Sequence, residues 1–148
     1  KLARYSWVFG DGTEADGAKV THGYEKPGSY SVSLTVTDDL GKACGTATDT
    51  LKVRVNTPPV ASPGPDREGF VGGAHDALVF DGSSSTDADG DPLTYRWAFG
   101  DGESGAGPKV YHLFKKPGRH VVRLTVNDGA GSRCAETSSS FNIEVKAR

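Results

Sequence analysis

Three aspartates near the middle of the chain form its densest group of side chains able to do chemistry. Asp87, Asp89 and Asp91 lie within five residues of one another. Hard carboxylate oxygens at this spacing can wrap a calcium ion. The segment is not an EF-hand, because Gly90 is its fourth residue rather than its sixth and Ala98, not glutamate, would be its twelfth. Aspartates also stabilise turns through hydrogen bonds to the nearby backbone, so the pattern is compatible with either a turn or a metal site.

Other residue types with catalytic potential are better explained as parts of a scaffold. Gly10-Asp11-Gly12 has no following Lys-Ser/Thr and no helix start, so it is predicted to be a turn rather than a phosphate-binding loop. His22 and His112 occupy equivalent places in two copies of one pattern, which favours a structural role. The serine runs 83–85 and 138–140 have no nucleophile elbow. No catalytic residue and no organic cofactor is predicted.

The elements that position these residues come from an internal repeat. Residues 7–56 align without a gap to residues 97–146, with 20 identities in 50 pairs. The shared pattern is a tryptophan strand ending in Phe-Gly-Asp-Gly, then a histidine, Lys-Pro-Gly, Leu-Thr-Val and a cysteine. Repeat 1 is therefore assigned to residues 1–56 and repeat 2 to residues 57–148. Residue 1 aligns with Asp91, so we expect repeat 1 to hold only the C-terminal half of its domain.

That expectation leaves three origins open for the strands missing from repeat 1. The chain is a fragment, or residues that precede residue 1 supply the strands, or another polypeptide supplies them by strand addition. We favour truncation or a nick.

Period-two alternation predicts an all-β chain. In repeat 2, Tyr95, Trp97 and Phe99 share one face of a strand over 94–99. Further strands are predicted over 77–80, 110–114, 120–126 and 141–145, and 30–36 and 51–55 match the last two in repeat 1. Six or seven strands in about 90 residues, with frequent turn signals, are typical of an immunoglobulin-like β-sandwich.

The charge, hydropathy and cysteine content of the chain limit the classes of partner that it can bind. A net charge of −2, with both signs scattered, offers no basic face for nucleic acid or anionic lipid. No apolar run is long enough to span a membrane. Cys44 and Cys134 sit at matching places in separate repeats, so no internal disulfide is expected. We expect free, partly buried thiols, with pairing to other segments or chains as the alternative.

These combined motifs resemble the PKD (polycystic kidney disease) domain family. Asn56-Thr57-Pro58-Pro59 resembles the opening of a PKD domain, and Phe80-Asp81-Gly82 through Tyr95 its second strand and loop. The resemblance implies two tandem β-sandwich repeats, the first incomplete, in an extracellular, cell-surface or periplasmic setting.

The resemblance also implies a function and a metal site. The function is that of a non-catalytic spacer or display module joined to other domains of a larger secreted or surface protein. The alternative is an adhesion module that binds polysaccharide or extracellular protein beside a secreted hydrolase. Some PKD domains hold structural Ca²⁺, and the positions carried over from them are Asn56, Asp87, Asp89 and Asp128.

Overall fold

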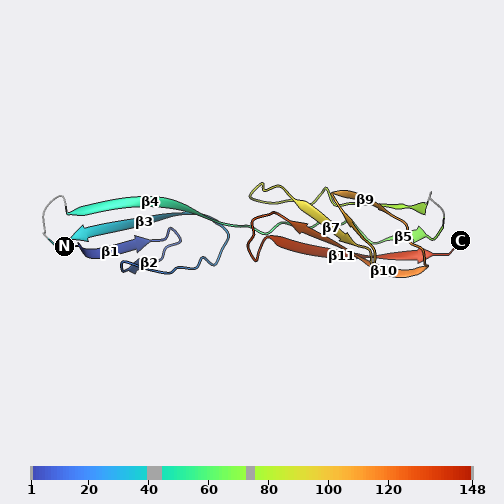
Figure 1. Ribbon diagram of the computed structural model, residues 1–148, viewed down its shortest axis with the longest axis horizontal. Helices are drawn as coiled ribbons and strands as arrows, with labels where there is room; N and C mark the ends of the chain where they lie inside the picture. The colour runs from blue at the N-terminus through green and yellow to red at the C-terminus, as the bar shows by residue number, and fades with distance from the viewer. Residues whose placement is uncertain (1, 40–44, 73–75, 148) are drawn as a thin grey trace. The chain divides into compact units, whose positions relative to one another are not determined.

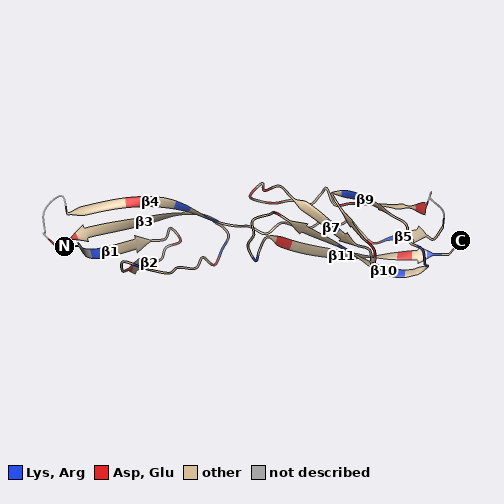
Figure 2. Ribbon diagram, in the orientation of Figure 1, with Lys and Arg blue, Asp and Glu red and all other residues tan. Residues whose placement is uncertain are grey.

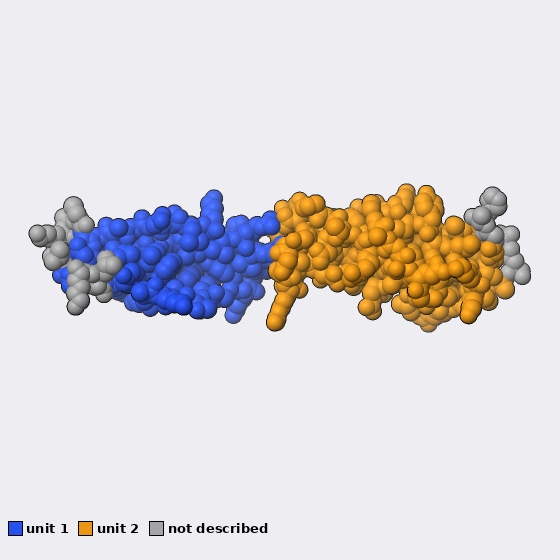
Figure 3. Space-filling model, viewed as in Figure 1, with its two compact units in different colours: residues 1–56 blue, residues 57–148 orange. Residues whose placement is uncertain are grey.

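The chain folds into two compact units, residues 1–56 and residues 57–148 (Figure 3). The computed structural model describes residues 2–39, 45–72 and 76–147. No α-helix occurs in these residues, and none of them forms a helix long and apolar enough to cross a membrane. The all-β class predicted from the alternating pattern is confirmed.

Unit 1 is a single antiparallel sheet with the strand order β2-β1-β3-β4 (Figure 1). Its strands are β1 (Leu2–Val8), β2 (Glu14–Asp16), β3 (Gly28–Asp38) and β4 (Thr46–Val55). The long β3–β4 hairpin pairs residues from Gly28↔Val55 to Thr37↔Thr46. Period-two sequences of this length pair stably because one face of each strand is apolar.

Unit 2 is built from two sheets, as an immunoglobulin-like sandwich requires. One has five strands in the order β5-β11-β10-β7-β8, and the other pairs β6 with β9. Strand β5 runs parallel to β11, whereas the remaining pairs are antiparallel. The strands are β5 (Arg67–Phe70), β6 (Leu78–Asp81), β7 (Thr94–Ala98), β8 (Ser104–Ala106), β9 (Lys109–His112), β10 (Gly118–Asn127) and β11 (Glu136–Lys146).

The core of unit 2 lies between these two sheets. Trp97 on β7 and Phe80 on β6 are both fully buried, with ring centroids 5.7 Å apart. The inward face of β10 contributes Val122, Leu124 and Val126, all at 0% exposure, as its alternation predicted. Burial of this aromatic and aliphatic surface is the main stabilising term for the unit.

Unit 1 repeats the local bonding of unit 2 around its tryptophan strand. Trp7 Nε1 donates to the Gly17 carbonyl at 2.9 Å, and Trp97 Nε1 donates to the Gly107 carbonyl at 3.1 Å. The strand ends alike in both units, because Gly10 and Gly100 take positive φ (81° and 80°). A Cβ at either glycine would lie 2.6 Å from a backbone oxygen of the neighbouring strand.

The structure differs from the predicted strands at several places. The expected strand over 110–114 is β9 and ends at His112, and the strand over 94–99 ends at Ala98. Strands β2, β5 and β8 were not predicted, since they are short and lack a clear apolar alternation.

The expectation of partly buried cysteines is wrong for Cys134. This thiol is free and exposed, because the adjacent Ala135 occupies the buried position at 3% exposure. Cys44 lies outside the described residues.

Charged residues of both signs are interspersed over the strands of each unit (Figure 2). Several form exposed pairs, such as Arg4–Asp16 at 2.9 Å and Lys146–Glu68 at 2.8 Å. Exposed pairs of this kind contribute little to stability.

Candidate functional site

The three aspartates between β6 and β7 lie together in the folded unit 2. One carboxylate oxygen from each of Asp87, Asp89 and Asp91 falls within 4.8 Å of the other two, and all three residues are half-buried. The loop is held by its own bonds, since the N–H groups of Asp89 and Asp91 donate to Asp87 Oδ1 at 2.9 and 3.2 Å. The backbone therefore directs three hard oxygen donors to one place.

The second oxygen of Asp87 is the feature of this loop that local turn bonding does not explain. Asp87 Oδ2 is buried and accepts no hydrogen bond from the residues that the structure describes. A buried carboxylate oxygen without a donor is costly, and a cation is one group that would satisfy it. The donor set of three carboxylates suits Ca²⁺, which prefers oxygen ligands.

Two of the four positions carried over from the family resemblance lie in the carboxylate group of this loop. Asp87 and Asp89 belong to the carboxylate group, and Asp91, which was not among the four, completes it. Asp89 Oδ2 also accepts a hydrogen bond from the Thr57 N–H at 2.7 Å, which ties the loop to the start of unit 2. Asp128 follows β10, is 4% exposed and lies outside the mutually close group; Asn56 is the last residue of unit 1.

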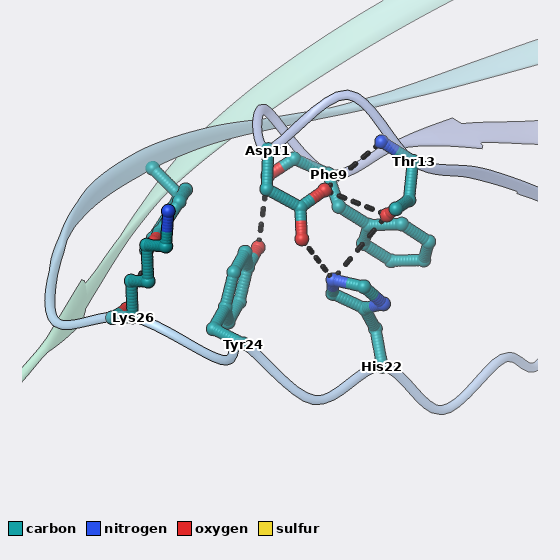
Figure 4. Close-up of polar contacts among 7 residues, drawn as sticks. Phe9, Asp11, Thr13, His22, Tyr24 and Lys26 are labelled. Atoms are coloured by element: carbon teal, nitrogen blue, oxygen red, sulfur yellow. Dashed lines mark hydrogen bonds and ion pairs between the residues drawn. The ribbon is translucent and has the colours of Figure 1, made fainter.

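A second polar constellation, an aspartate–histidine pair, occurs in each unit. In unit 1, His22 Nε2 lies 2.7 Å from Asp11 Oδ2, and its ring stacks on Phe9 with centroids 4.0 Å apart (Figure 4). The hydroxyl of Tyr24 donates to the Phe9 carbonyl at 3.0 Å. These contacts join the turn after β1 to the segment before β3.

Unit 2 repeats this pair with nearly identical geometry. His112 Nε2 lies 2.7 Å from Asp101 Oδ2, and its ring stacks on Phe99 at 3.9 Å with an interplanar angle of 1°. The edge of Phe114 meets the same imidazole at 4.7 Å. Sequence alone showed that the histidines are equivalent, but neither the stacking nor the carboxylate partner can be read from it.

The unit 1 pair does not form a catalytic triad, although a hydroxyl is close. In a triad the hydroxyl and the carboxylate bond opposite nitrogens of the imidazole. Here Thr13 Oγ1 and Asp11 Oδ2 both approach Nε2 of His22, at 3.4 and 2.7 Å. The Thr13 hydroxyl moreover donates to Asp11 Oδ1 at 2.6 Å, and Glu103 replaces it in unit 2.

The carboxylates of these pairs are tuned toward the ionised form. Hydrogen bonds to Asp11, of which the bond from the Thr13 hydroxyl has the largest effect, lower the pKa of its carboxyl from the usual 3.8 to about 2. They outweigh the effect of burial, which raises this pKa. Burial alone would raise the pKa of Asp101, but the N–H of Glu103 and the imidazole of His112 outweigh it and lower that pKa. Carboxylates held ionised by hydrogen bonds stabilise turns and are poor proton donors near neutral pH.

A family model described as "PKD domain" matches residues 1–53 and 56–145. The chain belongs to the PKD domain family. Its two matched ranges are two PKD repeats, and they leave only a few residues of the chain unmatched.

The PKD repeats are similar to segments of much longer curated proteins. A pre-pro-metalloprotease of Vibrio cholerae is 36% identical over 145 residues, which cover 98% of this chain and 14% of that protein. A collagenase of Clostridium perfringens is 37% identical over 103 residues, 69% of this chain and 9% of the collagenase. The chain thus spans a small part of the relatives it matches.

A solved structure of fibronectin(III)-like modules from Clostridium thermocellum is similar in fold. It has a TM-score of 0.50 and 17% identity, and it covers 99% of this chain and 79% of its own. At this identity the likeness concerns the β-sandwich architecture of the PKD repeats.

Proposed function

We propose that the chain is a non-catalytic spacer or display module of a larger extracellular, cell-surface or periplasmic protein. The observation that carries the proposal is that both aspartate–histidine pairs are used inside the fold, each stacked on a phenylalanine and repeated in the two units. Membership of a family of non-catalytic modules supports it. So does the small share of each protease relative that the chain covers.

The proposal is tested with the full chain and insoluble polymers. A spacer is expected to show no saturable retention on chitin, cellulose or fibrous collagen, and no release of soluble fragments from them. Retention that saturates, or release of fragments that scales with protein concentration, would refute the spacer assignment.

An adhesion module is the second candidate, favoured by exposed apolar side chains on the β6–β9 sheet. Tyr111 is 71% exposed and pairs across the strands with Val79, which is 36% exposed. Phe70 on β5 is 47% exposed. Exposed aromatic rings can stack on sugar rings or pack on fibrous protein. If retention is found, Tyr111→Ala should remove it, and Val121→Ala, at a similarly exposed aliphatic position, should not.

We also propose that the aspartate loop of unit 2 binds structural Ca²⁺, with Asp87, Asp89 and Asp91 as its carboxylate ligands. Asn56 and Asp128 remain the further candidates from the family resemblance. The buried Oδ2 of Asp87 supports the proposal. The ion would supply charge neutralisation for three converging carboxylates, with an affinity on the order of 10⁻⁴ to 10⁻³ M, as in other extracellular modules.

The calcium proposal is tested by thermal melting with Ca²⁺ and with excess chelator. A ligand that binds only the folded state raises the melting temperature of the unit. The increase should vanish in Asp87→Asn and persist in Asp49→Asn, a control on the exposed β4 strand of unit 1. A melting temperature that Ca²⁺ does not change in the unaltered chain would eliminate the site.

A further inference from the structure

Arg67 is a charged residue whose side chain lies between the two sheets of unit 2. It begins β5, which is an edge strand of the five-stranded sheet among the described residues, and it pairs with the buried Ile143 of β11. Its guanidinium carbon lies 4.7 Å from the ring centroid of Phe80 on β6 and 5.3 Å from that of Phe141 on β11. The side chain of Arg67 therefore reaches from one sheet to the other, beside the aromatic core.

The guanidinium of Arg67 is bonded to the backbone at the edge of β6. Its Nη1 donates to the Val79 carbonyl at 2.8 Å. Next to β6, the Gly82 N–H donates to the Pro108 carbonyl at 2.8 Å. Hydrogen-bonded and non-bonded pairs alternate along an antiparallel ladder, so Val79↔Tyr111, three pairs away, belongs to the non-bonded class. The N–H and carbonyl of Val79 therefore point away from β9, to the edge at which a further strand would add.

The stability of unit 2 does not by itself explain an arginine at this position. Nε of Arg67 is buried and has no hydrogen-bond acceptor among the described residues, and burial lowers the pKa of the guanidinium. A methionine would fill the space between the two phenylalanine rings without burying a charge or an unpaired donor. Inward-pointing charges on edge strands serve another purpose, because they oppose the addition of a strand from another molecule.

We propose that Arg67 keeps unit 2 from associating with a second copy of the chain through the edge of β6 that faces away from β9. Its guanidinium occupies the Val79 carbonyl and holds a positive charge beside Phe80 and Phe141. An added strand would have to displace this bond and bury the charge. Tandem β-sheet modules meet similar strands at a high effective concentration, so protection of this kind suits a spacer or display module.

The experiment compares the self-association of the unaltered full chain with that of two variants by sedimentation velocity. Reducing buffer excludes cross-links through the exposed thiol of Cys134. Arg67→Met should keep the circular dichroism spectrum of the unaltered chain and should self-associate at least about tenfold more tightly. Arg67→Gln removes the charge with a polar side chain and should also associate more tightly, so the proposal is tested even if Arg67→Met unfolds.

Two matched variants locate the association. Arg119→Met removes the same charge from an exposed position on β10 and should leave self-association unchanged. Arg67→Met combined with Val79→Pro should return to the behaviour of the unaltered chain. Because the Val79 N–H points away from β9, the proline removes no hydrogen bond of the β6–β9 ladder but blocks pairing with an added strand.

Three results would overturn the proposal. The first is that neither Arg67→Met nor Arg67→Gln associates more tightly than the unaltered chain. The second is equal association of the Arg119→Met chain, which would make the effect one of net charge alone. The third is association that persists when Val79→Pro is added to Arg67→Met, which would place the contact away from the edge of β6.

Discussion

Replacing the core tryptophan of unit 2 should destabilise that unit far more than the same change in unit 1. Trp97 is at 0% exposure between the two sheets and packs 5.7 Å from Phe80, so Trp97→Ala leaves a large cavity. Removal of a buried tryptophan costs about 3–5 kcal/mol. A domain of this size loses roughly 4–8 °C in melting temperature per kcal/mol, so we expect a decrease of at least about 12 °C.

Trp7→Ala is the matched control for this prediction. Trp7 donates the same hydrogen bond, to the Gly17 carbonyl, but it is only half-buried. Both variants lose the same hydrogen bond. The difference between their losses in the free energy of unfolding therefore measures the packing of Trp97 against the second sheet. Calorimetry and urea unfolding of the full chain measure both units. A loss below about 1 kcal/mol for Trp97→Ala, or equal losses in the two units, would refute this description of the core.

Two further predictions concern the turns. Gly100→Ala should destabilise unit 2 by about 1–3 kcal/mol or more in urea unfolding, because the new Cβ meets the Val121 carbonyl oxygen at 2.6 Å and φ is positive. Gly102→Ala, with positive φ but nothing within 4 Å, should cost less, and equal costs would contradict the role of the contact. In unit 1, hydrogen bonds to the Asp11 carboxylate, of which the bond from the Thr13 hydroxyl has the largest effect, lower its pKa from 3.8 to about 2. The ionised carboxylate therefore contributes its full stabilisation above pH 3.8, and this contribution is lost as the pH falls through 2. Melting from neutral pH to pH 2 should show this loss, and Asp11→Asn should reduce it; an unchanged pH dependence in the variant would contradict the assignment.

The strands of the second repeat could largely be predicted because their pattern is local. Val122, Leu124 and Val126 alternate with polar or exposed residues, and all three are buried as that alternation predicts. Strand β5 could not be predicted, since Arg67–Phe70 has no apolar alternation and is held by a parallel pairing with β11, far away in the sequence. Long-range pairing leaves little signal in a short segment.

For the candidate sites, the sequence identified the residues but not the contacts that they make. The spacing of Asp87, Asp89 and Asp91 already placed three carboxylates on one loop. The buried second oxygen of Asp87 depends on how the loop packs, which spacing does not encode. The equivalence of His22 and His112 pointed to a scaffold role, but their stacking on Phe9 and Phe99 joins elements that only the fold brings together.

The structural role of the aspartate–histidine pairs is tested most directly by a double-mutant cycle on Asp101 and His112. The free energy of unfolding is measured for Asp101→Ala, His112→Ala and the double variant. Contacting residues in one bonded network are expected to show a coupling energy of about 0.5–3 kcal/mol, with each single change destabilising unit 2. A coupling energy near zero, together with single variants that do not destabilise unit 2, would contradict the claim that these side chains stabilise the fold.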